Sequence, residues 1–465
     1  MSENIVHTNA SKYFFVHMLT RDIDLLDAIL DLVDNSIDGM FRKLNGTSSS
    51  DLTPYKIELI LNDEMFSIKD NCGGIELNTA INYAFKLGRD KNDDRDLDVS
   101  TIGMYGIGMK RAIFKIGKKC SVKSYADKAF EVEIGHDWLE SNDWSLPLKT
   151  EDVDILKDKT EIEVSDLSSG VKEKISSESF QDELYKSISR HYSRFIQKGL
   201  EITINGNDKI KPYPIKIFVD KDGSVKPYIY HEIKDGLEIK IVCGFNSPPK
   251  SNNDDSDSKE IVEKRGEDES GWTIFCNDRA VVFNDKTFLT GWGDGLPKYH
   301  PQFVVLSGVV EFNSTNASYL PVTTTKRGVD TSSDIYIRTK QLMKNGMKIF
   351  TSYTNKWKNF PRSDQKQFFD SVAKLEIPDI FETVIKNIPE DKWTTKKKDY
   401  EGGKEFIPNL PPAPRQKPDT KRISFTKKIR DIKDVAEYLF DDSNVDPNNV
   451  GEEAFNYVLS RAKEL

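Results

Sequence analysis

The chain has 465 residues, of which 37% are hydrophobic and 31% charged, and its formal net charge is −9. This balance excludes a mostly disordered or membrane-embedded protein and is typical of a folded protein with a charged surface, long enough for about three domains. The acidic excess disfavours a large nucleic-acid-binding surface, although it is compatible with a local basic patch.

Three features that the sequence lacks narrow the class of protein further. No stretch reaches the ~18 consecutive apolar residues of a membrane-spanning helix. The first residues lack the basic start and apolar run of a secretory signal. The four cysteines are scattered, with no CxxC pair and no histidine cluster, which disfavours a disulfide framework and a metal site built on cysteine. We therefore expect a cytoplasmic protein with no membrane partner.

In the N-terminal half, the pattern predicts helices mixed with strands. Apolar residues recur at steps of three and four between Thr20 and Met40, which predicts one amphipathic helix. The alternation in residues 56–71 predicts two strands around a turn at Asn62–Asp63. Further helices are expected at 77–87 and after Gly108, and further strands follow. This order indicates an α+β sandwich that ends near residue 200.

The C-terminal half is expected to hold a strand-rich α/β domain, a helical segment from about Asp334, an extended linker rich in Pro and Lys, and two short helices. The predicted divisions of the whole chain are residues 1–195, 196–335, 336–395, 396–422 and 423–465.

The first predicted helix carries a polar face. Asp31 and Asn35 lie one turn apart and Asp38 lies a further turn on, so the three side chains project from one side. A carboxylate and an amide stacked in this way can hold a water and a Mg²⁺ ion at a phosphate. The alternative is that Asp27, Asp31, Asp34 and Asp38 form an ordinary solvated acidic face.

Two glycine-containing loops follow. In IKDNCGGI, Asp70 ends a strand and can accept a hydrogen bond from an exocyclic amine, while Gly73 and Gly74 let the backbone approach a ligand. An ordinary Asp-Asn-Gly turn is the alternative. In IGMYGIGMKRA, three glycines lead into a helix, where backbone amides can cradle phosphate, although a tight loop would also use them. These glycines are Gly103, Gly106 and Gly108.

In this order and spacing, four segments resemble motifs of the GHKL (Bergerat-fold) ATPases, which include gyrase B, the ninety-kilodalton heat-shock chaperones, histidine kinases, MutL and MORC. DLVDNSIDG is similar to the helix motif Glu-Leu-Val-x-Asn-Ser-x-Asp-Ala, and DNCGGI to Asp-x-Gly-x-Gly. GMYGIG resembles the glycines of the lid loop, and KTEIEVSDL resembles the Gly-Thr-x-Ile-x-Val strand. The resemblance is nearest to bacterial MORC, MutL and chaperone-like proteins with a transducer domain.

The resemblance implies a Bergerat ATP-binding sandwich, a mixed sheet covered by helices, with ATP and Mg²⁺ as cofactors. It implies that Asn35 ligates Mg²⁺ and that Asp70, helped by Thr160, binds the adenine amino group. Gly74 would line the base pocket. The other residues implied to bind the nucleotide are Asp38, Gly103, Gly106, Gly108 and Lys110, whereas Arg111 is expected to be a surface residue.

Three departures from the family pattern affect the expected chemistry. Asp31 stands where the family has its general-base glutamate, and its carboxylate reaches ~1.5 Å less far, which is enough to slow hydrolysis. Cys72 replaces the first glycine of the loop, and Gly39 replaces the alanine at the helix end. We therefore expect ATP binding together with slow hydrolysis.

The following region, residues 196–335, resembles the transducer domain of MutL, MORC and the chaperones. There a loop lysine reaches the γ-phosphate, and LPVTTTKRGVD offers Lys326 for this catalytic role, although a plain surface loop is the alternative. The aromatic cluster Tyr13–Phe15 suggests an N-terminal strap that crosses to a second subunit.

The expected function is an ATP-dependent conformational switch or homodimer clamp, of a kind associated with DNA transactions or defence. The alternative is a nucleotide-gated scaffold with negligible hydrolysis that recruits an effector protein through its C-terminal helices. DNA is a weaker expectation, because the basic stretch from Lys396 to Arg430 is equally explained as a soluble linker.

Overall fold

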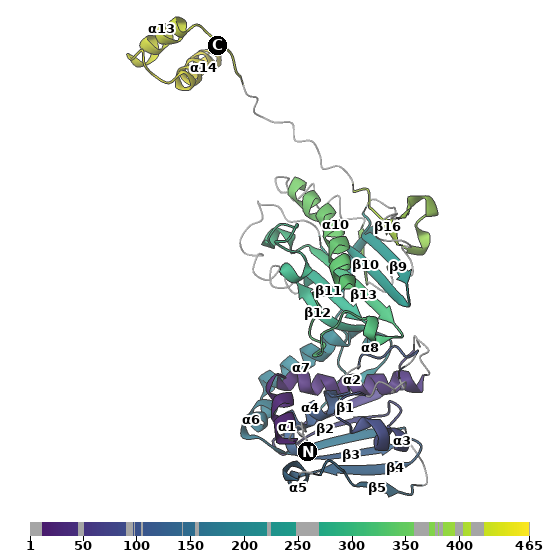
Figure 1. The fold of residues 1–465 in the computed structure, drawn as a ribbon. Coiled ribbons are helices and arrows are strands. Elements are labelled where there is room, and N and C mark those ends of the chain that lie inside the picture. Colours follow the sequence, from purple (N-terminus) through teal and green to yellow (C-terminus); the bar gives the residue numbers. More distant parts are fainter. Residues whose placement is uncertain are drawn as a thin grey trace, which may run out of the picture. The chain divides into compact units, whose positions relative to one another are not determined.

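The computed structural model describes residues 12–44, 51–89, 96, 98–103, 106–141, 143–153, 158–220, 225–247, 269–357, 372–376, 380, 385–395, 403–410 and 423–464. The chain divides into two compact units, Met1–Pro411 and Pro412–Leu465. The first unit holds two large sheets, each with its own helices (Figure 1). No helix in the described part of the chain is long and apolar enough to cross a membrane.

The first sheet has seven strands, and its edge strand β7 pairs with β1 in parallel, whereas the other described pairs are antiparallel. The predicted turn at Asn62–Asp63 is confirmed, because the Asn62 side chain accepts hydrogen bonds from the amides of Glu64 and Met65. In sheet order the strands are β5 (Leu148–Glu151), β4 (Ala129–Ile134), β3 (Gly117–Tyr125), β6 (Thr160–Leu167), β2 (Met65–Asp70), β1 (Lys56–Leu61) and β7 (Glu201–Ile204).

One hydrophobic core joins this sheet to helices α2 (Leu25–Lys43), α4 (Gly108–Ile116) and α7 (Glu178–His191). The expected mixed sheet covered by helices is therefore confirmed. The remaining helices of this region are α1 (Lys12–Arg21), α3 (Leu77–Thr79), the π-helix η1 (Ala80–Ala84), α5 (His136–Glu140), α6 (Ser169–Ser176) and α8 (Ser193–Gln197).

The long helix begins later than the sequence pattern predicts. Asp24 has an extended backbone and its side chain accepts a hydrogen bond from the Leu25 amide, so α2 starts at Leu25 and not at Thr20. Residues 12–21 form the separate helix α1, which Lys12 anchors through bonds from its Nζ to the carbonyls of Trp138 (2.5 Å) and Asp143 (2.6 Å). Residues 1–11 of the expected strap lie outside the described residues.

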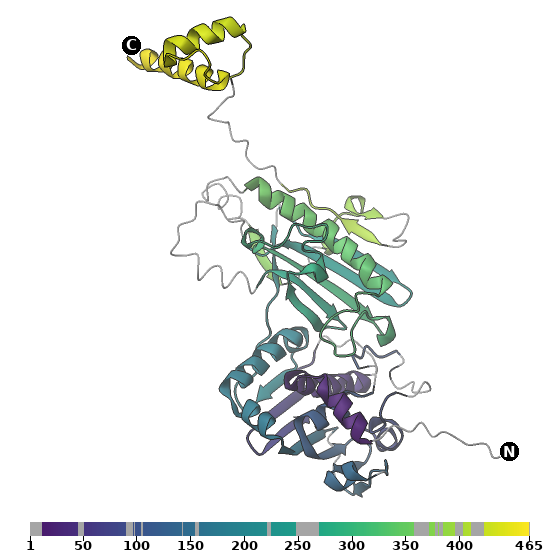
Figure 2. The same ribbon diagram turned by 60° about the vertical axis from the view of Figure 1, so that its left-hand side comes forward.

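The second sheet also has seven strands, and β11 and β13 pair in parallel. Figure 2 shows helix α10 (Asp334–Trp357) lying across this sheet, which agrees with the helix expected from Asp334. In sheet order the strands are β12 (Arg279–Asp285), β11 (Gly271–Cys276), β13 (Leu306–Ser314), β10 (Leu237–Phe245), β9 (Tyr228–Lys234), β16 (Lys404–Phe406) and β15 (Thr394–Thr395).

Two short pairings involve segments far along the chain. Strand β8 (Lys216–Asp220) pairs with β14 (Val372–Glu376) in a separate two-stranded sheet. Strand β16 pairs with β9, although it lies in the segment expected to be a linker. The expected linker is described only at residues 403–410, which carry β16; residues 396–402 and 411–422 lie outside the described residues.

The second unit contains the two expected helices, α13 (Ile429–Phe440) and α14 (Pro447–Glu464), which pack against one another. Among its described hydrophobic side chains, Ala436 and Val450 are buried, whereas many large ones are exposed. The exposed side chains are Ile423, Phe425, Ile429, Val435, Tyr438, Phe440, Phe455, Tyr457, Val458 and Leu459.

Helix α2 approaches the loop after β2 so closely that one of its residues has no room for a side chain. A Cβ atom at Gly39 would lie 2.9 Å from the carbonyl oxygen of Cys72, which is closer than real Cβ contacts. The close contact explains why glycine stands where the family resemblance has alanine.

We predict that Gly39→Ala lowers the free energy of unfolding, even though alanine favours a helix interior by about 1 kcal/mol over glycine. Gly170→Ala in α6 is the matched control, because a Cβ at Gly170 meets nothing within 4 Å and the change should be neutral or stabilising. Urea unfolding of both variants makes the comparison. A Gly39→Ala variant as stable as the control would show that the loop yields easily.

Candidate functional site

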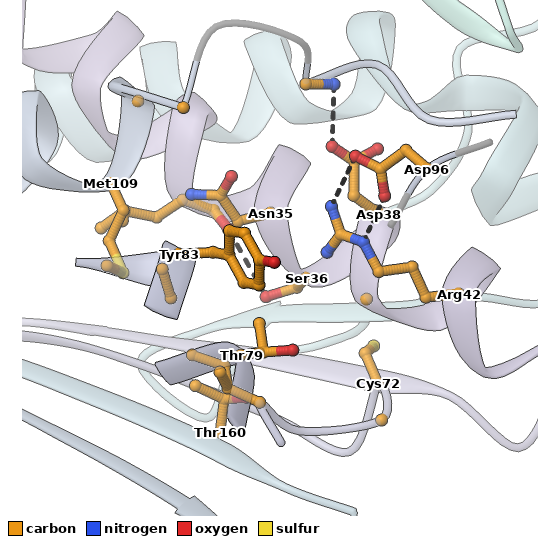
Figure 3. Close-up of a pocket in the computed structure, with 18 of the residues that line it drawn as sticks. Asn35, Ser36, Asp38, Arg42, Cys72, Thr79, Tyr83, Asp96, Met109 and Thr160 are labelled. Carbon is orange, nitrogen blue, oxygen red and sulfur yellow. Dashed lines mark hydrogen bonds and ion pairs between the residues drawn. The ribbon is translucent and has the colours of Figure 1, made fainter. Parts of the chain in front are cut away.

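A cavity of about 770 Å³ lies between α2 and the first sheet. In Figure 3, Asn35 and Ser36 of α2 lie on one side of it and Thr160 of β6 lies on the opposite side. The structure brings every site residue predicted from the sequence to the wall of this one cavity. These residues are Asp31, Asn35, Asp38, Asp70, Gly74, Gly103, Gly106, Gly108, Lys110, Thr160 and Lys326.

At one end of the cavity, Asp70 is buried at the end of β2. One of its carboxylate oxygens accepts a hydrogen bond from the Ser36 hydroxyl (2.7 Å) and the other from the Cys72 amide (2.9 Å). Thr160 lies beside Asp70 in the register between β2 and β6. Burial raises the pKa of Asp70 to about 6, and the hydrogen bonds from Ser36, the Cys72 amide and the Thr160 backbone only partly oppose this increase.

The loop after β2 depends on glycine where it meets the cavity. Gly74 has a φ of +72°, and a Cβ there would lie 3.0 Å from the Ala126 side chain. Cys72, in the position where the family resemblance has glycine, is buried and lines the cavity. Ser36 was not predicted as a site residue. Its place in the helix motif beside Asn35 is the signal that could have identified it.

Asp38 holds the glycine loop. Its two carboxylate oxygens accept hydrogen bonds from the backbone amides of Ile102 and Gly103, each at 2.8 Å. In this structure both oxygens are therefore used by the chain itself, and Asp38 acts at the cavity by positioning the loop. The family resemblance also implies that the chain between about Gly88 and Gly108 is a lid that ATP orders. Of this stretch, residues 90–95, 97, 104 and 105 lie outside the described residues.

The acidic residues of α2 do not form a solvated face. Asp31, Asp34 and Asp38 are 2%, 0% and 1% exposed, so the solvated alternative is wrong for these three. Asp31 lies 2.5 Å from Arg111 Nη2 and 3.5 Å from Lys326 Nζ. The expectation that Arg111 is a surface residue is also wrong, because it is 7% exposed and points from α4 to Asp31.

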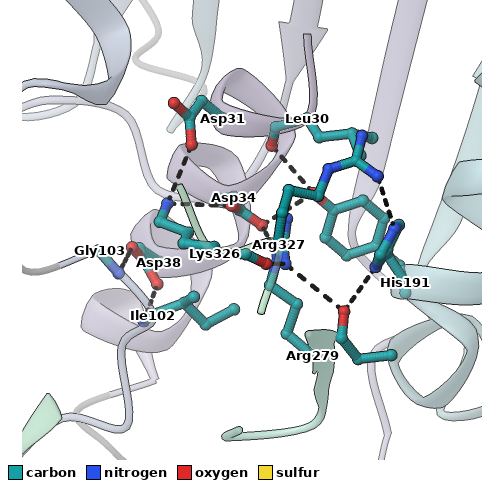
Figure 4. A network of polar contacts seen from close by, with 12 residues as sticks. Leu30, Asp31, Asp34, Asp38, Ile102, Gly103, His191, Arg279, Lys326 and Arg327 are labelled. Carbon is teal, nitrogen blue, oxygen red and sulfur yellow. Dashed lines mark hydrogen bonds and ion pairs between the residues drawn. The ribbon is translucent and has the colours of Figure 1, made fainter. Parts of the chain in front are cut away.

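Asp34, which was not predicted as a site residue, is the centre of a buried polar network (Figure 4). Its Oδ1 accepts hydrogen bonds from Arg279 Nε (2.6 Å) and the Tyr192 hydroxyl (2.8 Å), and its Oδ2 accepts one from Lys326 Nζ (2.9 Å). Burial alone would raise the pKa of Asp34, but the charges of Arg279 and Lys326 hold it at about 2.

The same network fixes the Lys326 backbone. Arg279 Nη1 donates a hydrogen bond to the Lys326 carbonyl oxygen (2.6 Å), and Lys326 has a φ of +56°, which non-glycine residues adopt rarely. Such strained positions persist where surrounding contacts hold them, often at functional sites. Arg279 begins β12 in the second sheet, so a residue of that sheet sets the position of Lys326 at the cavity. An arginine in the apolar run of this strand is the signal that could have identified it.

The residues present fit a Mg²⁺–triphosphate ligand. Among the described residues, the side-chain nitrogen of Asn35 is buried without a hydrogen-bond partner, and a ligand in the cavity would supply polar contacts to this amide. The described residues contain no cluster of three or more His, Cys, Asp or Glu that could hold a metal ion. Mg²⁺ keeps several waters and takes substrate phosphate oxygens with few protein ligands, so the side-chain oxygen of Asn35 would be the ligand and its nitrogen would donate to a phosphate oxygen.

The comparison with known families agrees with this geometry. Residues 23–168 match the model of the family described as histidine kinase-, DNA gyrase B-, and HSP90-like ATPase. The match covers α2, the loop after β2, the glycine loop and β6, and it ends before Arg279 and Lys326. No curated protein matches the chain.

We predict that Arg279→Met lowers the free energy of unfolding by about 3–5 kcal/mol, because it leaves the buried Asp34 carboxylate with one of its two counter-ions, Lys326. Lys209→Met is the control, since its ion pair with Glu201 is exposed at the lysine and its loss should have little effect. Urea unfolding measures both. Equal stabilities of the two variants would contradict a structural role for the Arg279–Asp34 pair.

Proposed function

We propose that this chain, whose residues 23–168 match the family of histidine kinase-, DNA gyrase B-, and HSP90-like ATPases, binds Mg-ATP in the cavity beside α2 and hydrolyses it slowly. The observation that carries the proposal is the convergence of eleven residues, chosen for nucleotide chemistry from separate segments, on one cavity. Fold membership alone would not support a site assignment.

In this proposal the base binds at the Asp70 end. Asp70 accepts a hydrogen bond from the adenine amino group, and Thr160 supports the contact from the neighbouring strand. The lone pairs that Ser36 and Cys72 leave unused on the carboxylate are available for this bond. Gly74 leaves room for the ring because no side chain projects from it.

The phosphates bind at the other end, where the glycine loop enters α4. Backbone amides at Gly106 and Gly108 face the phosphate oxygens, aided by the N-terminus of the helix, whereas the Gly103 amide stays bonded to Asp38 and holds the loop beside them. Lys110 is 6% exposed and lines the cavity, so its charge acts in a partly desolvated setting. Asn35 would hold Mg²⁺ through its side-chain oxygen, and the ion would supply charge neutralisation at the phosphates.

Asp31 is the residue that positions the attacking water. The water oxygen forms a bond to the γ-phosphorus, the bond from that phosphorus to the β–γ bridging oxygen breaks, and the water proton passes to the Asp31 carboxylate. The products are ADP and phosphate. Lys326 stabilises the negative charge that develops on the transferred group. The short side chain of Asp31 supports a slow rate.

Contacts with the second sheet support the proposal of a conformational switch. Asn277, in the turn between β11 and β12, donates a hydrogen bond to the Thr101 carbonyl oxygen (3.0 Å) next to the glycine loop. Arg279 and Lys326 reach Asp34 from the same domain. Nucleotide-dependent movement of the loop would therefore act on the second domain. We extend the proposal to an ATP-dependent homodimer clamp of the MORC/MutL kind, acting in the cytoplasm in DNA transactions or defence.

A second candidate is a nucleotide-gated scaffold with negligible turnover. The observation that favours it is the exposed apolar surface of α13 and α14, which a partner protein could cover. In that case the C-terminal unit recruits an effector and the cavity only senses nucleotide. For a role in DNA binding, the relevant segment is the basic stretch from Lys396 to Arg430, of which residues 396–402 and 411–422 lie outside the described residues.

The deciding experiment combines calorimetric binding of Mg-ATP with steady-state phosphate release. We expect the wild type to bind and turn over, Asp70→Asn to lose both, and the exposed-turn control Asp63→Asn to lose neither. Asp31→Asn should bind ATP but reduce turnover by at least about 100-fold, the scale of a lost general base. Binding without wild-type turnover would favour the scaffold, and a wild type that binds no ATP would overturn the proposal.

We also predict a pH dependence that originates at Asp70. The ionised carboxylate accepts a hydrogen bond from the adenine amino group. Because the pKa of Asp70 is about 6, the affinity for the nucleotide should fall as the pH drops below 6, and the fall should approach tenfold per pH unit. The charge of Lys159 favours ionisation of Asp70 and is outweighed by burial. Calorimetry of the wild type with adenosine between pH 5 and 8 isolates this effect, because adenosine carries the base but no phosphates that titrate. An adenosine affinity that stays constant below pH 6 would rule Asp70 out as the source.

A further inference from the structure

Arg111 is a buried cation whose hydrogen-bonding capacity is only partly used. It lies in the first turn of α4, three residues after Gly108, and lines the cavity. Its Nη2 contacts Asp31 Oδ2 at 2.5 Å. Its Nε is buried and has no hydrogen-bond partner among the described residues. A buried donor without a partner is costly, so its presence at a cavity wall indicates a ligand that completes it.

The surroundings of Arg111 favour an anion as that ligand. Asp31 already has a second cation, Lys326, at 3.5 Å, and Lys326 is itself shared with Asp34. Gly108, at the N-terminus of α4, packs against the Asp31 carboxylate, because a Cβ there would lie 3.5 Å from its Cγ. Arg111, Lys326 and the helix N-terminus thus meet at one point of the cavity. A guanidinium in such a place fits phosphoryl oxygens, which accept from two of its nitrogens at once.

We propose that Arg111 binds the terminal phosphate of the nucleotide and makes this site discriminate triphosphate from diphosphate. The inference rests on the proposed function and specifies how the site recognises its substrate. Without a terminal phosphate, Asp31 is the anion that satisfies Arg111. With it, the phosphate oxygens compete with Asp31 for the guanidinium, and the Asp31 carboxylate becomes available to a water molecule.

The competing explanation is that Arg111 and Asp31 form a purely structural pair between α4 and α2. Both explanations predict that removing Arg111 lowers stability, because Asp31 would be left buried with fewer counter-charges. They differ in nucleotide selectivity. If Arg111 is only structural, its removal should weaken ATP and ADP binding equally. If Arg111 binds the terminal phosphate, its removal should weaken binding of the triphosphate selectively.

The test is calorimetry of the full chain with Mg²⁺ and either a non-hydrolysable ATP analogue or ADP. We expect Arg111→Gln to weaken binding of the triphosphate analogue by about 10–100-fold, the scale of one charge-assisted contact, and to change ADP binding by less than about 3-fold. Lys115→Gln is the control, because it removes one positive charge from the same helix and its Nζ bonds the Thr20 carbonyl oxygen away from the cavity. This control should keep the wild-type ratio of the two affinities.

Asp31→Asn provides an independent measurement that does not require the loss of Arg111. Removing the competing carboxylate should tighten binding of the triphosphate analogue relative to ADP, by at least a few-fold, while a structural pair predicts no change in the ratio. ADP binding by each variant shows that it is folded. An unchanged ratio in both Arg111→Gln and Asp31→Asn would overturn the inference but leave the proposed function intact. A wild type that binds neither nucleotide would overturn both.

Discussion

A carboxylate buried in the middle of a helix must be paired, and Asp34 is paired with groups that lie outside the matched ATPase segment. Its side chain is fully buried, and desolvation of an unpaired carboxylate costs several kcal/mol. Arg279, Lys326 and Tyr192 provide the compensating contacts. Because Arg279 also bonds the Lys326 backbone, satisfying this one charge brings a lysine to the cavity wall and joins α2 to the second sheet.

Helix α2 connects the pairing of Asp34 to the proposed nucleotide site. Its apolar face packs into the core above the first sheet, while its polar face contacts the cavity along its length. Ser36 supports Asp70 at the proposed adenine end, and Asp38 holds the glycine loop. Asp31 meets the cations at the proposed phosphate end. The helix therefore sets the spacing between the two ends of the site, because its side chains follow a rigid repeat.

The parts of the site that were predictable from the sequence are those built from short spacings. Asp31, Asn35 and Asp38 follow the helical repeat, and Asp70 with Gly74 marks a strand end and its turn. These residues could therefore be predicted from a few neighbouring positions in the sequence. The contacts of Arg111 and Arg279 are set by residues 80 and 245 positions away, which no local pattern encodes. The same reason applies to β16, whose composition suggested a linker and whose pairing with β9 is a long-range event. The start of α2 was missed because one capping residue, Asp24, decided it.

The position of Lys326 and Arg279 outside the matched ATPase segment has a consequence for modularity. A fragment of the chain that stops at the end of that segment would retain Asp34 and lose all three of its partners, because Tyr192 also follows residue 168. The boundary suggested by sequence similarity therefore passes through the physical site. The smallest unit that keeps the Asp34 carboxylate fully paired is the pair of sheets together with the network between them. The matched segment alone lacks these partners.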